Sequence, residues 1–325
     1  MMTPANDIRR VAVVGTGLIG SSWAALFLAR GLDVVATDPA PGTEQKLRDH
    51  ITRIWPTLAR LGLSPGATPE RLRFDADLET AVKEVDFIQE NGPEQEEFKV
   101  KLFAELDAIL PAHVILASSS SGLTMSAIQA GCRHPGRCVI GHPFNPPHLI
   151  PLVEVVGGRA TSTESLARAC AFYARMGKKP ILLHKEVPGH VANRLQAALW
   201  REVVHLVDQG VISVSDADDA VSWGPGLRWG VMGPNLIFHL GGGQGGLEHF
   251  LAHLSGPFSR WWEDLGNPIL TPGLKEKLIQ GVKDETAGRS IAELEKQRDE
   301  LLLQLLALRT KASPPLPPTT SPPLH

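Results

Sequence analysis

The chain of 325 residues carries, close to its start, a glycine-rich segment that few backbone arrangements accommodate. An apolar, β-branched run from Val11 to Val14 leads into Gly15-Thr16-Gly17-Leu18-Ile19-Gly20, and the helix-like segment SSWAALFLARG follows at once. In a dinucleotide-binding unit the first glycine makes the turn, the second admits the pyrophosphate and the third packs helix against strand. Residues 15–20, the glycine turn, therefore predict a nucleotide-binding α/β domain.

The end of the second apolar run indicates which dinucleotide binds. Asp38 closes the run LDVVATD, eighteen residues after Gly20, where a carboxylate accepts hydrogen bonds from the ribose hydroxyls of the adenosine half. The residues that follow are Pro-Ala-Pro-Gly, with no arginine to receive a 2′-phosphate. The sequence therefore predicts NAD as the cofactor. The residues expected to contact it here are Gly15, Gly17, Leu18, Ile19, Gly20 and Asp38.

Seven short apolar runs alternate with helix-like segments up to about Glu186: VAVVG, DVVATD, VDFIQE, HVILASSS, RCVIGH, IPLVEVV and KPILLH. Such alternation is typical of βαβ units with a mostly parallel sheet. Pro188 and Gly189 then interrupt the chain before a long helical pattern over residues 191–209. We therefore predict the α/β class, with a Rossmann-type NAD-binding domain over residues 1–187 and an all-helical substrate and dimerisation domain over residues 188–311.

The end of the chain combines an apolar stripe with a proline-rich tail. Ser290 and Glu293 form a capping box, which predicts the start of a helix. Apolar residues with a three-four spacing follow one face of that helix: Ile291, Leu294, Leu301, Leu305 and Leu308. The stripe suits either a helix that covers its own domain or one that forms a dimer. The proline-rich composition of residues 312–325 predicts an extended, flexible tail.

A histidine and a glutamate in the middle of the chain suggest a proton acceptor. His142 lies in a segment punctuated by prolines, which predicts a turn, and Glu154 lies twelve residues later inside an apolar strand. A buried carboxylate requires a partner, and His142 is the obvious candidate. Because a carboxylate stabilises the protonated imidazole, the pair suits the removal of a proton from an alcohol. Together with NAD it indicates a dehydrogenase that acts on a CH–OH group.

Composition excludes several other classes of function. A formal net charge of −3 does not favour binding to nucleic acid or to an anionic membrane. No apolar run is close to the length of about 20 residues that is needed to span a bilayer. The cysteines Cys132, Cys138 and Cys170 form no C-x-x-C pair, and the first residues contain no apolar signal core. We therefore expect a cytoplasmic protein with no nucleic-acid or membrane partner, and we predict no metal site.

The motifs taken together resemble the 3-hydroxyacyl-CoA dehydrogenase superfamily. Its pattern is a dinucleotide fingerprint, a serine-rich strand end, H-x-F-N-P, L-V-E-V and P-G-x-x-x-N-R. All five elements occur here in that order, between Val11 and about Gly210. The resemblance implies that His142 is the base and Glu154 its orienting partner.

The same resemblance implies further site residues. Ser121 and Asn193 would hold the reacting oxygen or its neighbouring carbonyl, and Asn145 would support that cluster. Glu94 and Lys99 match the contacts that the family makes to the nicotinamide side and the ribose side of the cofactor. The family likeness also implies a homodimer that forms through the helical C-terminal domain.

The C-terminal region departs from the acyl-CoA enzymes and resembles the L-carnitine dehydrogenase branch of the superfamily, in the segments ALWREVVHLVDQG and GPGLRWGVMGPNLIFHLGGGQGGLEHF. This resemblance implies a small free 3-hydroxy acid as substrate, with L-carnitine the best candidate. The guanidinium fork of Arg228 would fit the substrate carboxylate. A quaternary ammonium group is best bound by aromatic faces, for which Phe144 and Trp229 are candidates.

Three alternatives to carnitine oxidation stay open from the sequence. The substrate could be another small 3-hydroxy acid, such as gulonate or 3-hydroxybutyrate. It could instead be a 3-hydroxyacyl-CoA, which would need a basic groove for the phosphates of CoA. The chain could also be a crystallin-like structural protein that binds NAD without catalysis, although His142, Glu154 and Asn193 are intact.

Overall fold

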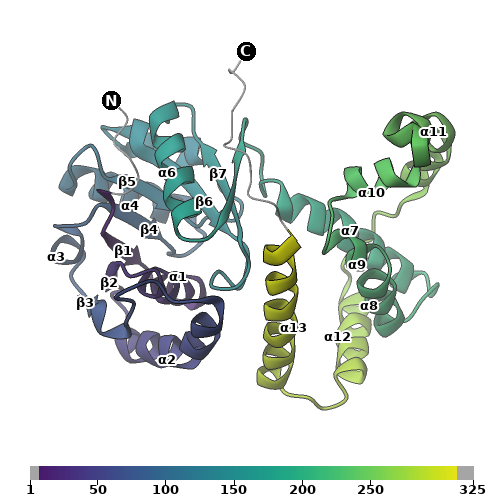
Figure 1. Cartoon of the computed structure of the whole chain (residues 1–325), viewed down its shortest axis with the longest axis horizontal. Coiled ribbons are helices and arrows are strands. Elements are labelled where there is room, and N and C mark those ends of the chain that lie inside the picture. The colour runs from purple at the N-terminus through teal and green to yellow at the C-terminus, as the bar shows by residue number, and fades with distance from the viewer. Residues whose placement is uncertain (1–6, 313–325) are drawn as a thin grey trace. The chain divides into compact units, whose positions relative to one another are not determined.

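The computed structural model describes residues 7–312 and shows two compact units, one that ends at Arg194 and one that begins at Leu195 (Figure 1). The first unit is an α/β domain, and the described part of the second is helical. The predicted fold class is therefore confirmed. The domain boundary expected after residue 187 lies close to this division and stays a prediction, and the predicted tail, apart from Ala312, lies outside the described residues.

The first unit is built on one eight-stranded sheet, in the order β3-β2-β1-β4-β5-β6-β7-β8. Neighbouring strands from β3 to β6 are parallel, β7 runs antiparallel to β6, and β8 is parallel to β7. Each of the seven predicted runs overlaps a strand. The strands are β1 (Arg10–Val14), β2 (Asp33–Thr37), β3 (Leu72–Phe74), β4 (Phe87–Glu90), β5 (Ile115–Ser118), β6 (Cys138–Pro143), β7 (Leu152–Gly157) and β8 (Lys179–Leu183).

Helices cover both faces of this sheet because its strands are apolar on both sides. Val11 and Val13 belong to one core cluster with α1, α2 and α6, whereas Ala12 and Val14 point to the other, with α3, α4 and α5. The α-helices are α1 (Leu18–Ala29), α2 (Thr43–Leu61), α3 (Leu78–Val82), α4 (Glu96–Ile109), α5 (Met125–Ile128) and α6 (Thr163–Arg175). Short 3₁₀ turns occur at η2 (Pro69–Arg71), η3 (Gln129–Gly131) and η4 (Pro135–Arg137).

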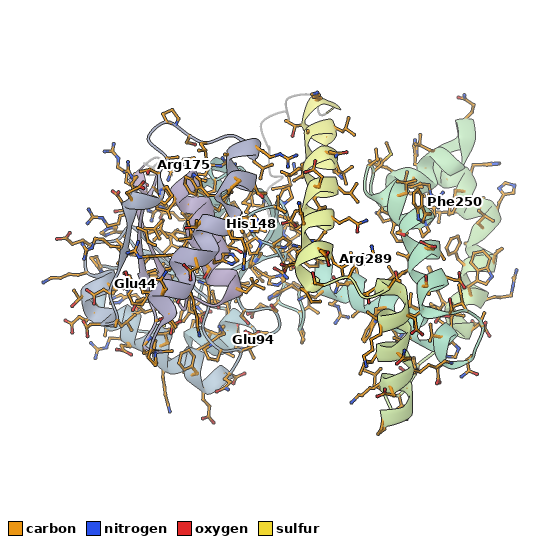
Figure 2. The ribbon with its side chains drawn as sticks, turned by 90° about the horizontal axis from the view of Figure 1, so that it is seen from below. Glu44, Glu94, His148, Arg175, Phe250 and Arg289 are labelled. Atoms are coloured by element: carbon orange, nitrogen blue, oxygen red, sulfur yellow. The ribbon has the colours of Figure 1, made fainter. Side chains whose placement is uncertain are left out.

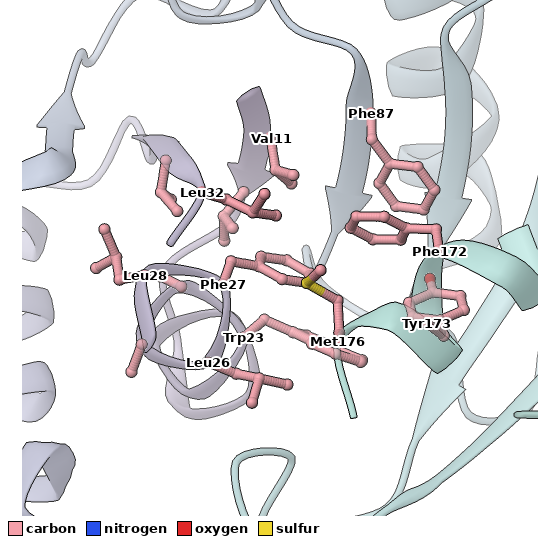
Figure 3. Close-up of a cluster of buried hydrophobic side chains, with 14 of the residues drawn as sticks. Val11, Trp23, Leu26, Phe27, Leu28, Leu32, Phe87, Phe172, Tyr173 and Met176 are labelled. Atoms are coloured by element: carbon pink, nitrogen blue, oxygen red, sulfur yellow. The ribbon is translucent and has the colours of Figure 1, made fainter. Parts of the chain in front are cut away.

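Aromatic side chains fill the larger of the two cores (Figure 3). Trp23 and Phe27 of α1 stack on each other with ring centroids 5.2 Å apart, and Phe172 of α6 stacks on Phe87 of β4 at 4.3 Å. Tyr173 completes the cluster 5.6 Å from Trp23. This packing fixes α1, whose N-terminus carries the glycine turn, against the middle of the sheet.

The second unit consists of helices in its described part. They are α7 (Ala192–Asp208), which crosses the division between the units, α8 (Val214–Trp223), α9 (Pro225–Trp229), α10 (Pro234–Gly241), α11 (Gly246–Asp264), α12 (Pro272–Thr286) and α13 (Ile291–Ala312), with a 3₁₀ turn at η5 (Gly243–Gly245). The expected capping box starts α13, because Glu293 Oε2 accepts from the Ser290 backbone N at 2.8 Å. Within residues 7–312, no helix is long and apolar enough to span a bilayer.

Candidate active site

The glycine turn has the shape that a bound pyrophosphate requires. Gly15 has a φ of +88°, and a Cβ at Gly20 would lie 1.9 Å from the Gly15 carbonyl oxygen, so neither position admits a side chain without strain. Gly17 differs, because no atom lies within 4 Å of the place its Cβ would occupy. The open space beside Gly17 is where a phosphate can approach the backbone.

Helix α1 offers its N-terminus to the same space. No side chain caps the helix and its first turn contains no acidic residue, so its amide donors and its positive dipole end are left for an anion. Asp38, at the end of β2, accepts hydrogen bonds from the backbone N of Thr16 at 2.9 Å and of Ala40 at 3.0 Å. Thr16 Oγ1 also donates to Oδ2 at 3.2 Å, so Oδ1 is the oxygen that keeps acceptor capacity for a ribose hydroxyl. The residues present therefore fit a bound dinucleotide.

His142 and Glu154 form a cross-strand pair in the antiparallel ladder of β6 and β7. The Nδ1 atom of His142 lies 2.8 Å from Glu154 Oε2. The prediction that His142 lies in a turn was wrong, because the strand continues to Pro143 and the prolines of the turn come after it. An antiparallel register places paired side chains on the same face of the sheet, which is what brings the two residues together.

Glu154 is fully buried, and its second oxygen is also occupied. Oε1 accepts hydrogen bonds from the backbone N of Val191 at 2.8 Å and of Ala192 at 2.9 Å, at the start of α7. Burial by itself would raise the pKa of Glu154, but the hydrogen bonds from His142 and from these two amides bring that pKa below its ordinary value. Glu154 is therefore ionised at neutral pH and can stabilise a positive charge on His142.

The end of β5 brings the predicted polar groups together. Asn193 Nδ2 donates to the backbone oxygen of Ser121 at 3.1 Å. Glu94, labelled in Figure 2, accepts from Ser120 Oγ at 2.6 Å and from the backbone N of Ser121 and Gly122 at 2.9 Å each. Burial opposes ionisation of Glu94, yet these hydrogen bonds lower its pKa below the ordinary value. Ser121 itself is exposed.

Lys99 is buried instead of exposed to a ligand. Its ammonium group contacts both oxygens of Glu90, at 2.7 and 2.9 Å, and the backbone oxygen of Gly92 at 3.2 Å, while Glu94 Oε2 lies 3.7 Å away. Its side chain is 1% exposed. With these acceptors in place, Lys99 holds the Glu90–Glu94 segment, and its contact with the cofactor stays a prediction.

The predicted substrate residues have different surroundings. The rings of Phe144 and His142 are nearly perpendicular, at 80°, with centroids 6.3 Å apart, and Asn145 is exposed directly after Phe144. Arg228 and Trp229 end α9 in the second unit, where both are exposed. Their contact with a substrate stays a prediction.

Sequence reasoning missed a second histidine. His190 is buried, and its ring centroid lies 5.1 Å from that of His142. The available signal was its position directly after Pro188-Gly189, within a motif already taken as part of the site. Among residues 7–312 no cluster of histidine, cysteine or acidic side chains is arranged to hold a metal.

Comparison with known proteins agrees with this geometry. Residues 10–187 match the NAD binding domain of 3-hydroxyacyl-CoA dehydrogenase, and residues 189–270 match the C-terminal domain of that enzyme. L-carnitine dehydrogenases from Streptomyces coelicolor and Pseudomonas aeruginosa are each 47% identical over 96% of this chain and 98% of their own.

A solved structure of similar shape is that of 5-formyl-3-hydroxy-2-methylpyridine 4-carboxylic acid 5-dehydrogenase, an NAD+-dependent dismutase. It is 31% identical, has a TM-score of 0.81 and covers 93% of this chain and 99% of its own. The glycine turn, the His142–Glu154 pair and these likenesses agree on one conclusion: the chain belongs to the 3-hydroxyacyl-CoA dehydrogenase family.

Proposed function

We propose that the protein oxidises the 3-hydroxyl group of L-carnitine to the ketone of 3-dehydrocarnitine, with NAD as the hydride acceptor. The observation that carries the proposal is the buried His142–Glu154 pair, with its 2.8 Å contact, in a domain whose glycine turn fits a dinucleotide. The choice of carnitine rests on near full-length relatives that are named L-carnitine dehydrogenase. These relatives favour carnitine over gulonate, 3-hydroxybutyrate and acyl-CoA substrates.

The pair supplies the base for this reaction. His142 Nδ1 is engaged by Glu154, which leaves Nε2 to accept the proton of the substrate hydroxyl. Glu154, ionised and held by two backbone amides, stabilises the imidazolium that results. We propose that Ser121 and Asn193 hold the oxygen that becomes the ketone, which the hydrogen bond from Asn193 Nδ2 to the backbone oxygen of Ser121 supports.

The cofactor would be held by residues of the first unit. Gly17, Leu18 and Ile19 would present the backbone and the N-terminus of α1 to the pyrophosphate, and Asp38 would accept the adenosine ribose hydroxyls. NAD, when bound, supplies the acceptor for the hydride from C3. Glu94 would face the nicotinamide half, with Lys99 fixing its segment.

Two groups of the proposed substrate need recognition besides its hydroxyl. We propose that Arg228 binds the carboxylate and that aromatic rings, with Phe144 and Trp229 as candidates, face the trimethylammonium group. Arg228 and Trp229 are exposed, and Phe144 is partly exposed, with its ring centroid 6.3 Å from that of the base His142. A guanidinium fork matches a carboxylate, and an aromatic face attracts a cation that has no hydrogen to donate.

The test is the rate of NADH formation with a panel of substrates at saturating NAD. The panel contains L-carnitine, D-carnitine, gulonate, 3-hydroxybutyrate and 3-hydroxybutyryl-CoA. We expect kcat/KM for L-carnitine to exceed every other value by about 100-fold or more. Gulonate, 3-hydroxybutyrate and the CoA ester lack a group that the carboxylate pocket or the ammonium pocket binds, and D-carnitine has the opposite configuration at C3, the carbon that loses the hydride. Preference for gulonate or 3-hydroxybutyrate would support NAD-dependent oxidation of a 3-hydroxyl group but reject carnitine as the substrate. If no substrate reduces NAD, the result would favour a structural protein.

We further propose that the protein acts as a homodimer. The second unit exposes many large apolar side chains for its size, which is typical of a surface that another subunit covers. They include Trp223, Leu227, Leu236, Leu240, Trp261, Trp262 and Ile269, each more than half exposed. We also propose that the protein works in the reducing cytoplasm, in keeping with three cysteines that are all free thiols.

A further inference from the structure

His190 is a buried imidazole beside the base that the proposed reaction does not use. It is 2% exposed, and its ring is tilted by 48° to that of His142 at a centroid distance of 5.1 Å. Burial of an imidazole costs free energy, because the ring loses hydration that an apolar side chain of similar size does not have. The buried position of His190 therefore calls for a structural or functional explanation.

The backbone at His190 adopts a conformation that residues with a side chain seldom choose. Its φ is +50°, and among the described residues only Ala287 shares a positive φ without being glycine. Gly189 before it also has a positive φ, of +75°. The two residues that follow, Val191 and Ala192, direct their amides to one oxygen of Glu154. The left-handed turn at residues 189–190 therefore directs two successive backbone amides at the Glu154 carboxylate. Successive backbone amides are a common anion-binding arrangement in proteins.

The His190 ring contacts the opposite side of the site. Its Nε2 lies 2.9 Å from the backbone oxygen of Ser120, and a carbonyl oxygen can only accept, so Nε2 carries the hydrogen. Its Nδ1 is buried with no hydrogen-bond partner among the described residues. Burial lowers the pKa of His190, the Ser120 carbonyl opposes this, and the nearby His142 lowers it further. The net lowering keeps the ring neutral at neutral pH.

These contacts give one residue two points of attachment within the site. Its backbone turn directs the following amides at Glu154, and its ring donates a hydrogen bond to the backbone oxygen of Ser120. The neighbouring residue, Ser121, accepts a hydrogen bond from Asn193. We propose that His190 is a positioning residue that sets the distance between the His142–Glu154 dyad and the Ser120–Ser121 segment. The inference rests on the proposed function in so far as the reacting oxygen lies between these two parts.

Neutrality of His190 is part of this role. When His142 accepts a proton it becomes a cation, and a second cation 5.1 Å away would repel it. A His190 ring with a raised pKa would therefore weaken the base that it positions. The short distance between the rings explains why the ring must donate to a carbonyl and not to a carboxylate, which would favour its charged form.

Three substitutions separate the functions of the ring. His190→Gln keeps an N–H donor at the reach of Nε2, His190→Phe keeps the ring volume without a donor, and His190→Asn tolerates the left-handed backbone without reaching Ser120. His184→Gln is the matched control, because His184 is exposed on the same segment. For each protein the melting temperature, the Kd for NAD, and kcat and KM for substrate are measured.

We expect His190→Phe and His190→Asn to lower kcat about 100-fold, since misplacement by about 1 Å has that effect, while the Kd for NAD changes less than about threefold. His190→Gln should recover kcat to within about fivefold of the native value, and His184→Gln should equal it. Native-like kcat in His190→Phe, or no recovery in His190→Gln relative to His190→Phe, would overturn the proposal.

A second measurement does not depend on turnover or on the folding of variants. In native protein labelled with ¹⁵N-histidine, we expect His190 to show the neutral tautomer with hydrogen on Nε2 near neutral pH. A charged ring, or hydrogen on Nδ1, would overturn the proposal. If the native protein oxidises no member of the substrate panel, the proposed function fails, and this measurement still decides the state of His190.

Discussion

At the scale of single residues, the chemistry depends on His142, whose ring is nearly buried against Glu154 and Phe144. His142→Ala should lower kcat by about 10²–10⁴-fold, because general-base assistance is lost. The Kd for NAD should stay within about twofold, since the expected cofactor contacts of the glycine turn do not involve His142. Isothermal titration with NAD and steady-state kinetics check both expectations, and turnover near the native rate would remove His142 as the base.

Glu154 permits a sharper test than deletion. Glu154→Gln keeps the shape of the side chain, so its carbonyl oxygen can still accept from Val191 and Ala192, but its amide N–H₂ then faces His142 Nδ1. That donor forces hydrogen onto Nε2 of His142, the atom that must accept the substrate proton. We expect kcat to fall by about 10²–10⁴-fold, with the melting temperature close to that of the native protein. A variant that keeps more than a tenth of native kcat would contradict this account.

At the scale of elements, we expect alanine substitutions of two glycines at the start of α1 to have different effects, one on stability and the other on NAD binding. A methyl group at Gly20 would lie 1.9 Å from the Gly15 carbonyl oxygen, so Gly20→Ala should lose about 1–3 kcal/mol of stability or more. Gly17 has an ordinary φ of −62° and open space, so Gly17→Ala should melt like the native protein. The methyl group should nevertheless weaken NAD binding at least about tenfold, or about 1.4 kcal/mol. Equal NAD affinity in Gly17→Ala would argue against a pyrophosphate that approaches the backbone at this glycine.

Lys178 holds the turn between β6 and β7, and we expect it to make the stability of the fold depend on pH. Lys178, just before β8, donates to the backbone oxygens of Pro147 and Ile150, and its ammonium lies 5.1 Å from the Trp23 ring. Burial, helped by the charge of Arg30, lowers the pKa of Lys178 from 10.5 to about 7. Between about pH 7 and 10.5 the unfolded chain therefore binds more protons at this position than the folded chain, so we expect the contribution of Lys178 to the free energy of unfolding to rise with pH.

Comparison with Lys178→Met isolates this contribution, because every other group titrates in both proteins. Over that pH interval the native protein should gain stability relative to the variant, with a slope of at most about 1.4 kcal/mol per pH unit. Urea denaturation at several pH values measures the difference. Parallel stability profiles for the two proteins would show that Lys178 stays charged in the folded state.

At the scale of the whole molecule, the exposed apolar side chains of the second unit predict self-association. Light scattering on the native protein should give twice the mass of one chain. Trp262→Glu and Trp223→Glu place a charge on side chains that are 67% and 76% exposed, and we expect them to shift the equilibrium toward the monomer. Leu63→Asp, at a 39% exposed position of the first unit, is the control. A native protein with the mass of one chain would reject the dimer.

Much of the fold could be predicted because its signals are local. The β-branched run before Gly15, the spacing to Asp38 and the serine-glutamate box at Ser290 each depend on residues a short distance apart. The alternation of apolar runs with helix-like segments likewise predicts βαβ units with a mostly parallel sheet. The helical second unit likewise follows from its apolar periodicity and its caps.

The sequence by itself determined that a dinucleotide fold, a histidine and a buried glutamate occur in one chain. Only the tertiary structure decided that His142 lies in a strand opposite Glu154, and that His190 reaches Ser120 across 70 residues. The buried position of Lys99 was also decided there, by its pairing with Glu90. The physical reason is that periodicity reports which way a side chain points, whereas contact across a sheet depends on strand register and on packed neighbours.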